Sequence, residues 1–394
     1  MVTIMKKSIK LLLFSIFWIV VMFLLNFIYP NYLPTLFGGL LKVAFYYHIL
    51  IFLLAYFLVV MFHELAHALA FIFKGVKLKM ILILIFLFHK TKRWHLSIDP
   101  RLIILGGGMV MPDFERIESE SDIIFYKKAI SFSLLFAPIF TIVSSVVLTL
   151  MNLLFFYDVP MFTVISFYIL LFSMFFTYTS TLQAQGIYGD FIAYKKVMTD
   201  PIFGLSIISQ FMDDITLFHY DYVRTKLLEE KPSDFSIHLL NFYTLLLEKG
   251  IYDDNDIDKE LLEKTKVLAT SPHIVRRISR QYKLIEVIQQ AILYLYRCQE
   301  DGLVDQLLPM YFAEIEKMAV KDTVKEYYRK QINHYLGRVD EREYLSEKRD
   351  IHHGLMGLIL SHLPEYQDIE NEHLEPIERF EKKEMIHLDN LDSM

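Results

Sequence analysis

Four long stretches without acidic or basic side chains constrain this chain more than any other feature of its sequence. They are Leu11–Tyr29, Val43–Phe73, Ala129–Tyr157 and Met161–Gly186, and Glu64 in the second is the sole exception when histidines are left aside. A helix needs roughly 20 apolar residues to cross the hydrocarbon core of a bilayer. We therefore expect an α-helical polytopic membrane protein with about four transmembrane helices.

The charges are divided unevenly along the chain. Residues 1–200 carry 16 basic and 10 acidic side chains, whereas residues 201–394 carry 24 and 36, and the net charge is −6. This division excludes a single soluble domain, a fibrous chain and a disordered chain. It also argues against nucleic acid as a partner, because no basic surface dominates. We expect a membrane-embedded domain over residues 1–200 and an acidic cytoplasmic domain over residues 201–394.

The positions of the cations predict the orientation in the membrane, because loops rich in Lys and Arg stay on the cytoplasmic side. Basic residues cluster before the first stretch, between the second and third, and after the fourth. The two other loops contain only Lys42 and Asp158 as charged residues. We therefore expect a multi-pass protein of the cell membrane with both termini in the cytoplasm. Its richness in Phe, Ile and Lys is typical of a low-GC bacterium.

The segment between the second and third stretches contains two apolar pieces that are too short to cross a bilayer. The first is Met80–Phe88, and the second, Leu102–Met111, is interrupted by Gly106, Gly107 and Gly108. Pieces of this length fit a re-entrant or interfacial β-hairpin. Such a hairpin is tolerated at membrane depth where protein or a wet cavity satisfies its backbone.

The second stretch also contains a pattern typical of metal sites, His63-Glu64-Leu65-Ala66-His67. On a helix, positions i and i+4 differ by about 40° of rotation, so both imidazoles face the same side and can bind Zn²⁺ together. Glu64 could then act as general base toward a water molecule. The pattern also occurs by chance, but a carboxylate inside an apolar span costs several kcal/mol without a compensating partner. A bound metal is the simplest such partner.

A third metal ligand is expected at the same depth in the membrane. The two histidines lie near the cytoplasmic end of the second stretch, and Asp190 lies just past the cytoplasmic end of the fourth. The other acidic residues of the first half lie in charged loops, on the opposite side of the membrane or beyond its end. Asp190 is therefore the best candidate, although an ordinary carboxylate at a helix terminus is the alternative interpretation.

These elements together resemble the site-2 protease family of intramembrane zinc metalloproteases. After the His-Glu-x-x-His pattern, Ile104–Val110 resembles the family's glycine-containing membrane hairpin. Phe136-Ala137-Pro138 stands in the position of its Ala-Gly-Pro span, and Gly189 precedes Asp190 where the family has Leu-Asp-Gly. The resemblance covers roughly residues 40–200.

The resemblance implies a zinc metalloprotease domain in which His63, His67 and Asp190 bind the metal and Glu64 is the catalytic base. The chain departs from the family's pattern near the aspartate. No Asn or Pro precedes it at the usual place, and Phe191 replaces the usual Gly. These departures indicate a divergent branch.

Two further roles stay open at the level of the sequence. Gln183, Gln185 or a neighbouring threonine could donate a hydrogen bond to the oxyanion of the tetrahedral intermediate, or these side chains could join helices. An exposed hairpin edge could pair with an unwound substrate strand. Gly106, Gly107 and Gly108 would let that strand approach closely, whereas a flexible turn is the alternative interpretation of the three glycines.

The second half has the hydrophobic period of amphipathic helices. The clearest runs are residues 236–248, 282–297, 303–318 and 324–336. None of them has catalytic spacing, so we expect an all-α soluble domain, with a helical repeat as one option, that binds a cytoplasmic protein partner. The strongly charged segment after Pro364 is expected to be frayed or mobile.

The sequence thus predicts a zinc metalloendopeptidase that contacts membrane lipid and cleaves a membrane-embedded protein or peptide precursor near the cytoplasmic leaflet. One alternative is a non-proteolytic scaffold that binds zinc or a peptide and recruits a partner through residues 201–394. Another is a membrane-embedded zinc protease with a distal Glu ligand, but the third and fourth stretches contain no Glu. Cys298 is the single cysteine, which excludes an intrachain disulfide and a cysteine-based zinc cluster.

Overall fold

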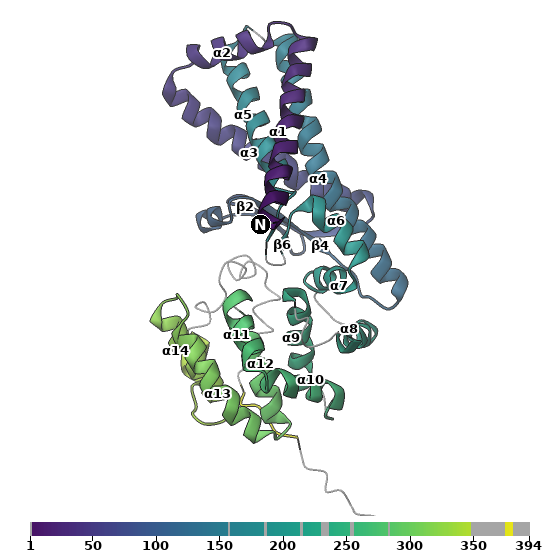
Figure 1. Cartoon of the computed structure of the whole chain (residues 1–394), viewed down its shortest axis with the longest axis vertical. Coiled ribbons are helices and arrows are strands. Elements are labelled where there is room, and N and C mark those ends of the chain that lie inside the picture. Colours follow the sequence, from purple (N-terminus) through teal and green to yellow (C-terminus); the bar gives the residue numbers. More distant parts are fainter. Residues whose placement is uncertain are drawn as a thin grey trace, which may run out of the picture. The chain divides into compact units, whose positions relative to one another are not determined.

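The chain folds into two compact units, Met1–His219 and Tyr220–Met394. The computed structural model describes residues 2–156, 158–184, 187–212, 216–229, 236–252, 256–282, 284–347 and 375–380. Most of them are helical, and Figure 1 labels the helices and strands. The assignment of a protease domain to residues 1–200 and of a cytoplasmic domain to residues 201–394 stays a prediction.

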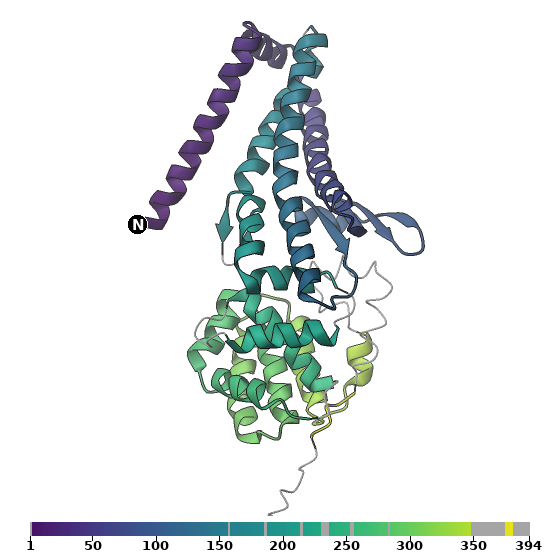
Figure 2. The same cartoon turned by 90° about the vertical axis from the view of Figure 1, so that its right-hand side faces the viewer.

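Three long apolar helices form the bundle of the first unit. They are α3 (Phe45–Phe73), α4 (Glu120–Phe155) and α5 (Pro160–Thr179), and each is long and apolar enough to cross a membrane. Figures 1 and 2 show them side by side, with α4 in contact with both of the others. Small hydroxyl side chains are buried inside the bundle, whereas many large apolar side chains are exposed outside it. This arrangement is typical of helix packing in lipid.

The first predicted span is a bent pair of helices. The helices α1 (Val2–Ile28) and α2 (Tyr32–Lys42) meet at an angle of 99°. The break lies at Pro30, which disfavours helical conformation in the residue before it. The described residues therefore contain three candidate spans, or up to four if the bent pair counts as one. The predicted number of four crossings stays a prediction.

The predicted hairpin is one part of a four-stranded antiparallel sheet between α3 and α4. Its strands have the order β3-β2-β1-β4 and comprise β1 (Lys77–Ile83), β2 (Phe86–Lys90), β3 (Trp94–Ile98) and β4 (Gly108–Asp113). A 3₁₀ helix, Pro100–Leu105, joins β3 to β4. The strand β3 was not predicted, although Trp94–Ile98 alternates apolar and polar residues as a half-buried strand does, because this short run directly follows a cluster of cations.

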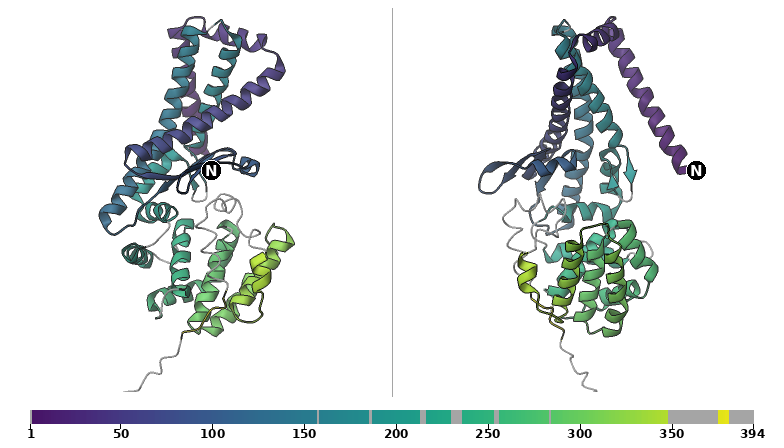
Figure 3. Two further views of the ribbon diagram at one scale, coloured as in Figure 1. Left: turned by 180° about the vertical axis from the view of Figure 1, so that it is seen from behind. Right: turned by 90° about the vertical axis from the view of Figure 1, so that its left-hand side faces the viewer.

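One face of this sheet is turned toward α3. Phe86 on β2 packs against Phe57 of α3, with 5.7 Å between ring centroids. Phe86 pairs with Ile98 across the strands, so Trp94, Leu96 and Ile98 lie on that same face of β3. These three side chains are exposed, and Figures 2 and 3 show β2 and β3 projecting beyond the bundle. The sheet thus extends the apolar surface of α3 outward.

The fourth predicted span ends earlier than its apolar stretch. Helix α5 ends at Thr179, and a short hairpin of β5 (Gln183–Ala184) and β6 (Ile187–Tyr188) follows. The chain then enters α6 (Asp190–Thr199), which packs against α4, and α7 (Pro201–Ser209). This hairpin carries the chain from α5 to the start of α6.

The second unit is helical, and the four predicted amphipathic runs correspond to α9, α12, α13 and α14. Helix α12 contacts α9, α10, α13 and α14 and lies at the centre of this unit. That the unit is a separate soluble domain stays a prediction. The helices are α8 (Leu217–Glu229), α9 (Ile237–Tyr252), α10 (Lys259–Ala269), α11 (Pro272–Arg277), α12 (Ile285–Arg297), α13 (Asp301–Glu316), α14 (Asp322–Tyr335) and α15 (Arg342–Glu347).

Part of the charged C-terminal segment packs against these helices, which differs from the expected mobility after Pro364. Within Glu375–Phe380, Ile377 is 7% exposed, and the backbone amides of Ile377 and Phe380 donate hydrogen bonds to helix residues. The expectation is therefore wrong for these six residues. Residues 364–374 and 381–394 lie outside the described part of the chain.

Candidate metal centre

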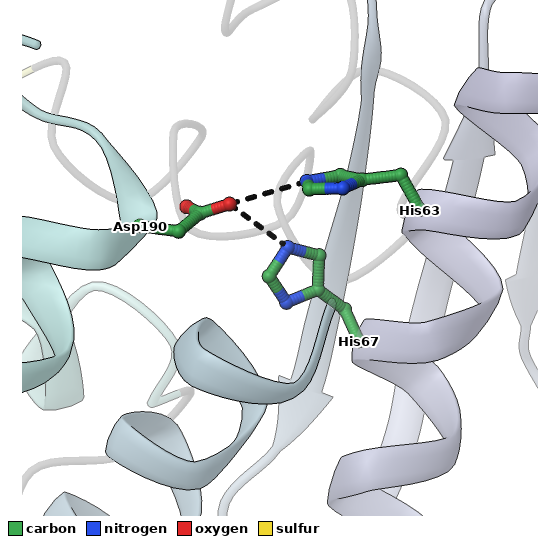
Figure 4. Close-up of side chains that lie close together, drawn as sticks. All are labelled: His63, His67 and Asp190. Carbon is green, nitrogen blue, oxygen red and sulfur yellow. Dashed lines mark ion pairs between the residues drawn. The ribbon is translucent and has the colours of Figure 1, made fainter. Parts of the chain in front are cut away.

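Helix α3 brings two histidines to the interior of the bundle. His63 and His67 lie one turn apart on the same face, because side chains at i and i+4 are neighbours on a helix. Their ring centroids are 4.9 Å apart, and the planes are nearly perpendicular at 87°. Figure 4 shows both imidazoles extending from α3 in the same direction. The helix therefore presents two nitrogen donors to one point.

Asp190, the first residue of α6, faces the two imidazoles. Its Oδ2 lies 3.1 Å from Nε2 of His63 and 3.7 Å from Nε2 of His67 (Figure 4). The residue before it has to be glycine, because a Cβ on Gly189 would lie 2.4 Å from the carbonyl oxygen of Thr179. This close approach of backbones holds the start of α6 against the end of α5 and directs the carboxylate toward α3.

The three side chains predicted as metal ligands thus come together in the structure. Their donor atoms lie within 4.8 Å of one another, so His63, His67 and Asp190 form a group that could hold a metal ion. Two imidazole nitrogens and a carboxylate oxygen are a donor set that zinc accepts in catalytic sites, where a fourth position stays open.

Two hydroxyl groups of α4 orient the imidazoles. Nδ1 of His63 lies 3.1 Å from Oγ1 of Thr141, and Nδ1 of His67 lies 3.0 Å from Oγ of Ser133. The Thr141 hydroxyl donates its proton to the carbonyl oxygen of Ala137, and the Ser133 hydroxyl donates to that of His67. Each hydroxyl has thereby used its only proton, so it can only accept a hydrogen bond from its imidazole. The ring proton of each histidine therefore belongs on Nδ1.

This proton position fits metal binding. A neutral imidazole with its proton on Nδ1 keeps a lone pair on Nε2, and both Nε2 atoms face Asp190. Partners that fix the tautomer in this way are typical of histidines that bind metals. Ser133 and Thr141 were not predicted from the sequence. Their signal is the recurrence of small or hydroxyl residues at every fourth position of α4, from Ser133 to Thr149.

Glu64, the predicted catalytic base, is buried beside the first residue of β4. A Cβ on Gly108 would lie 2.3 Å from Cγ of Glu64 and 2.4 Å from the carbonyl oxygen of Leu82. Only glycine lets this strand pass so close to the carboxylate-bearing side chain. Because β4 is an edge strand of its sheet, an edge of the sheet begins directly at Glu64.

The three glycines that were predicted to act together have different surroundings. Gly106 has a positive φ of 60° and ends the 3₁₀ helix, and Tyr56 donates a hydrogen bond to its carbonyl oxygen. A Cβ on Gly107 would meet nothing closer than 3.9 Å. Of the three, Gly108 is the glycine whose Cα lies against Glu64. A substrate-binding role stays a prediction for all three.

The candidates for oxyanion stabilisation are not brought to the metal centre by any contact that the structure describes. Gln183 lies in β5 and pairs with Tyr188. Gln185 lies outside the described residues. This role therefore stays a prediction.

Comparison with known protein families gives a match. The family model described as peptidase family M50 matches residues 51–333 of the chain. This range contains the whole metal centre and continues through most of the helices of the second unit. No curated protein and no solved structure matches the chain significantly.

We expect the Thr141→Val and Ser133→Ala variants to bind zinc about 10- to 100-fold more weakly, because each leaves one imidazole without the partner that fixes its tautomer. Chelator competition on the purified protein in detergent measures this affinity. Ser145→Ala is the matched control, since this hydroxyl of α4 donates to the carbonyl oxygen of Thr141 and not to an imidazole. Unchanged zinc affinity in both test variants would contradict the proposed orientation of the rings.

Proposed function

The chain belongs to peptidase family M50, the family of the site-2 proteases, and from this premise we propose that it is a zinc-dependent intramembrane endopeptidase. Its substrate is a membrane-embedded protein or peptide precursor, cleaved near the cytoplasmic leaflet. The observation that carries the proposal is the convergence of His63, His67 and Asp190 beside the buried carboxylate of Glu64. A scaffold that only binds zinc would not need this carboxylate, so its presence favours an enzyme.

The proposed mechanism assigns one task to each polar group. His63 and His67 hold zinc through Nε2, and Asp190 holds it through a carboxylate oxygen. Zinc bound there supplies Lewis acidity toward a water molecule and the scissile carbonyl. Glu64 accepts a proton from the attacking water and later donates it to the amine nitrogen as the C–N bond breaks. Ser133 and Thr141 keep the two imidazoles in the tautomer that leaves Nε2 free.

The substrate is proposed to bind as an extended strand along β4. A peptide bond inside a helix is shielded by its neighbours, so a helical substrate has to unwind locally before cleavage. An edge strand can bind the unwound segment through main-chain hydrogen bonds. The edge at β4 supports this proposal, because Gly108 places the start of that strand next to Glu64.

The metal centre is proposed to lie at the cytoplasmic side of the membrane, with the sheet at the lipid interface. The exposed face of Trp94, Leu96 and Ile98 continues the apolar surface of α3. Lys92 and Arg93 lie exposed in the adjoining turn. Aromatic and cationic side chains next to apolar ones are typical of the membrane–water interface. The acidic second unit then lies in the cytoplasm, where we propose that it recruits a protein partner.

Glu64→Gln is expected to lower cleavage about 10²- to 10⁴-fold, because it removes the group that transfers the proton, and to keep zinc. His67→Ala and Asp190→Ala are expected to lose both zinc and cleavage. The measurement compares zinc content with cleavage of a membrane-tethered reporter that the wild-type chain cuts in proteoliposomes. Glu115→Gln, an exposed acid paired with Lys77, is the control, and full cleavage by Glu64→Gln would refute the mechanism.

Gly108→Ala is expected to reduce cleavage at least tenfold while zinc content stays unchanged. The added Cβ forces either Glu64 or the start of β4 to move, since it would lie 2.3 Å from Cγ of Glu64. Gly107→Ala is the matched control, because its Cβ has ordinary space. Equal activity of the two variants in the same reporter assay would remove the support for substrate binding at this edge.

The proposed orientation is tested with single cysteines in a chain whose buried Cys298 is replaced by Ser. A membrane-impermeant thiol reagent added to intact cells is expected to label Cys introduced at Asp158 and not Cys introduced at Lys92. The cysteine of the Lys92→Cys variant is expected to be labelled only after the membrane is opened, because the loop around position 92 is rich in cations and should stay cytoplasmic. Labelling in the reverse order would place the metal centre on the other side.

A further inference from the structure

The segment Glu375–Phe380 lies across the C-terminal ends of two helices of the second unit. The amide of Ile377 donates a hydrogen bond of 2.9 Å to the carbonyl oxygen of Tyr335, the last residue of α14. The amide of Phe380 donates one of 3.0 Å to the carbonyl oxygen of Arg297, the last residue of α12. Carbonyl groups at helix C-termini lack intrahelical partners, so the segment supplies donors that these helix ends need.

The side chains of the segment add specific contacts to these main-chain bonds. Ile377 is the apolar anchor, with 7% of its surface exposed. The guanidinium of Arg379 donates to both carboxylate oxygens of Asp301, at 2.7 and 3.2 Å, and lies 4.1 Å from the ring centroid of Tyr296. Asp301 and Tyr296 of the second unit thus contact an arginine that lies two positions after a buried aliphatic residue.

The end of the segment is recognised in the same manner. The guanidinium of Arg297 lies 4.4 Å from the ring centroid of Phe380. The side-chain amide of Gln299 donates to the carbonyl oxygen of Phe380. Arg297 is the last residue of α12 and Gln299 lies in the turn before α13, so this helix end and turn contact an aromatic residue through its ring and its backbone. Glu375 at the other end pairs with Arg342.

We propose that this surface is a peptide-binding site for extended segments of the pattern aliphatic-x-Arg-aromatic. The site, called the peptide site below, consists of Tyr296, Arg297, Gln299, Asp301 and Tyr335. The chain's own Glu375–Phe380 occupies it as a tethered ligand, and a segment of the same chemistry in a partner protein displaces this ligand.

The balance of contacts makes the tethered segment displaceable. It has one buried apolar anchor, and its ion pair of Arg379 with Asp301 is exposed on both sides, with 38% and 58% of the side-chain surfaces accessible. Exposed ion pairs contribute little to affinity, so the segment alone binds weakly. The covalent connection compensates, because a segment of the same chain can be present at an effective concentration of about millimolar. A partner segment that adds contacts can therefore compete.

The test uses the full-length chain in detergent and a fluorescent peptide with the sequence of residues 374–381. A vacated variant carries Ile377→Asp and Arg379→Glu, which remove the anchor and reverse the charge opposite Asp301. We expect the vacated variant to bind the peptide saturably in fluorescence anisotropy. Its affinity should exceed that of the wild-type chain at least tenfold, because the wild-type site is already occupied. This result does not depend on proteolytic activity.

Exchanging the charges of Arg379 and Asp301 distinguishes specific recognition of the peptide from misfolding of the variant. The peptide with Arg379→Glu should bind the vacated variant at least tenfold more weakly than the natural peptide. When Asp301→Arg is added to the vacated variant, this preference should reverse. Equal affinity of wild-type and vacated chains, or an absent reversal, would overturn the proposal. A wild-type dimer that the vacated variant loses would assign the segment to a second copy of the chain and overturn the proposal of a ligand in cis.

Discussion

Two imidazoles and a carboxylate inside an apolar helix have to be compensated by partners, and the first unit is organised around this requirement. Helix α3 carries all three groups, α4 supplies the two hydroxyls that hold the imidazoles, and α6 supplies the opposing carboxylate of Asp190. The polar atoms thus meet at one level of the bundle, where large apolar side chains cover the outside. Even the connection after α5 serves this end, since Gly189 lets α6 begin close enough for its first residue to reach α3.

The sequence predicted those parts that depend on local patterns. A run of apolar residues indicates a span wherever it occurs, so α3, α4 and α5 could be found, and the spacing of His63 and His67 fixes their common face. Asp190 could be found because few acids remain at that depth. Ser133 and Thr141 could not be distinguished from hydroxyls that bond back to their own helix, because their second bond depends on how α4 packs against α3. The bend between α1 and α2 and the third strand of the sheet depend on packing in the same way.

The second unit shows a different limit of sequence reasoning. Its helices follow from hydrophobic period, but composition predicted that the charged C-terminal segment would be mobile. Glu375–Phe380 nevertheless packs, because its backbone amides reach helix-end carbonyls and Ile377 finds an apolar position. Main-chain hydrogen bonds of this kind cannot be predicted from amino-acid composition. The family match, which continues to residue 333, indicates that these helices accompany the metal centre and are not an unrelated addition.

Zinc K-edge X-ray absorption on the purified chain tests whether His63, His67 and Asp190 hold one zinc ion together. We expect a single zinc ion per chain, with two imidazole nitrogens at about 2.0–2.1 Å and only oxygen atoms as its other nearest ligands. His63→Ala should abolish this spectrum. Fewer than two imidazole ligands, or a spectrum that is unchanged in His63→Ala, would show that these three residues do not hold the ion together.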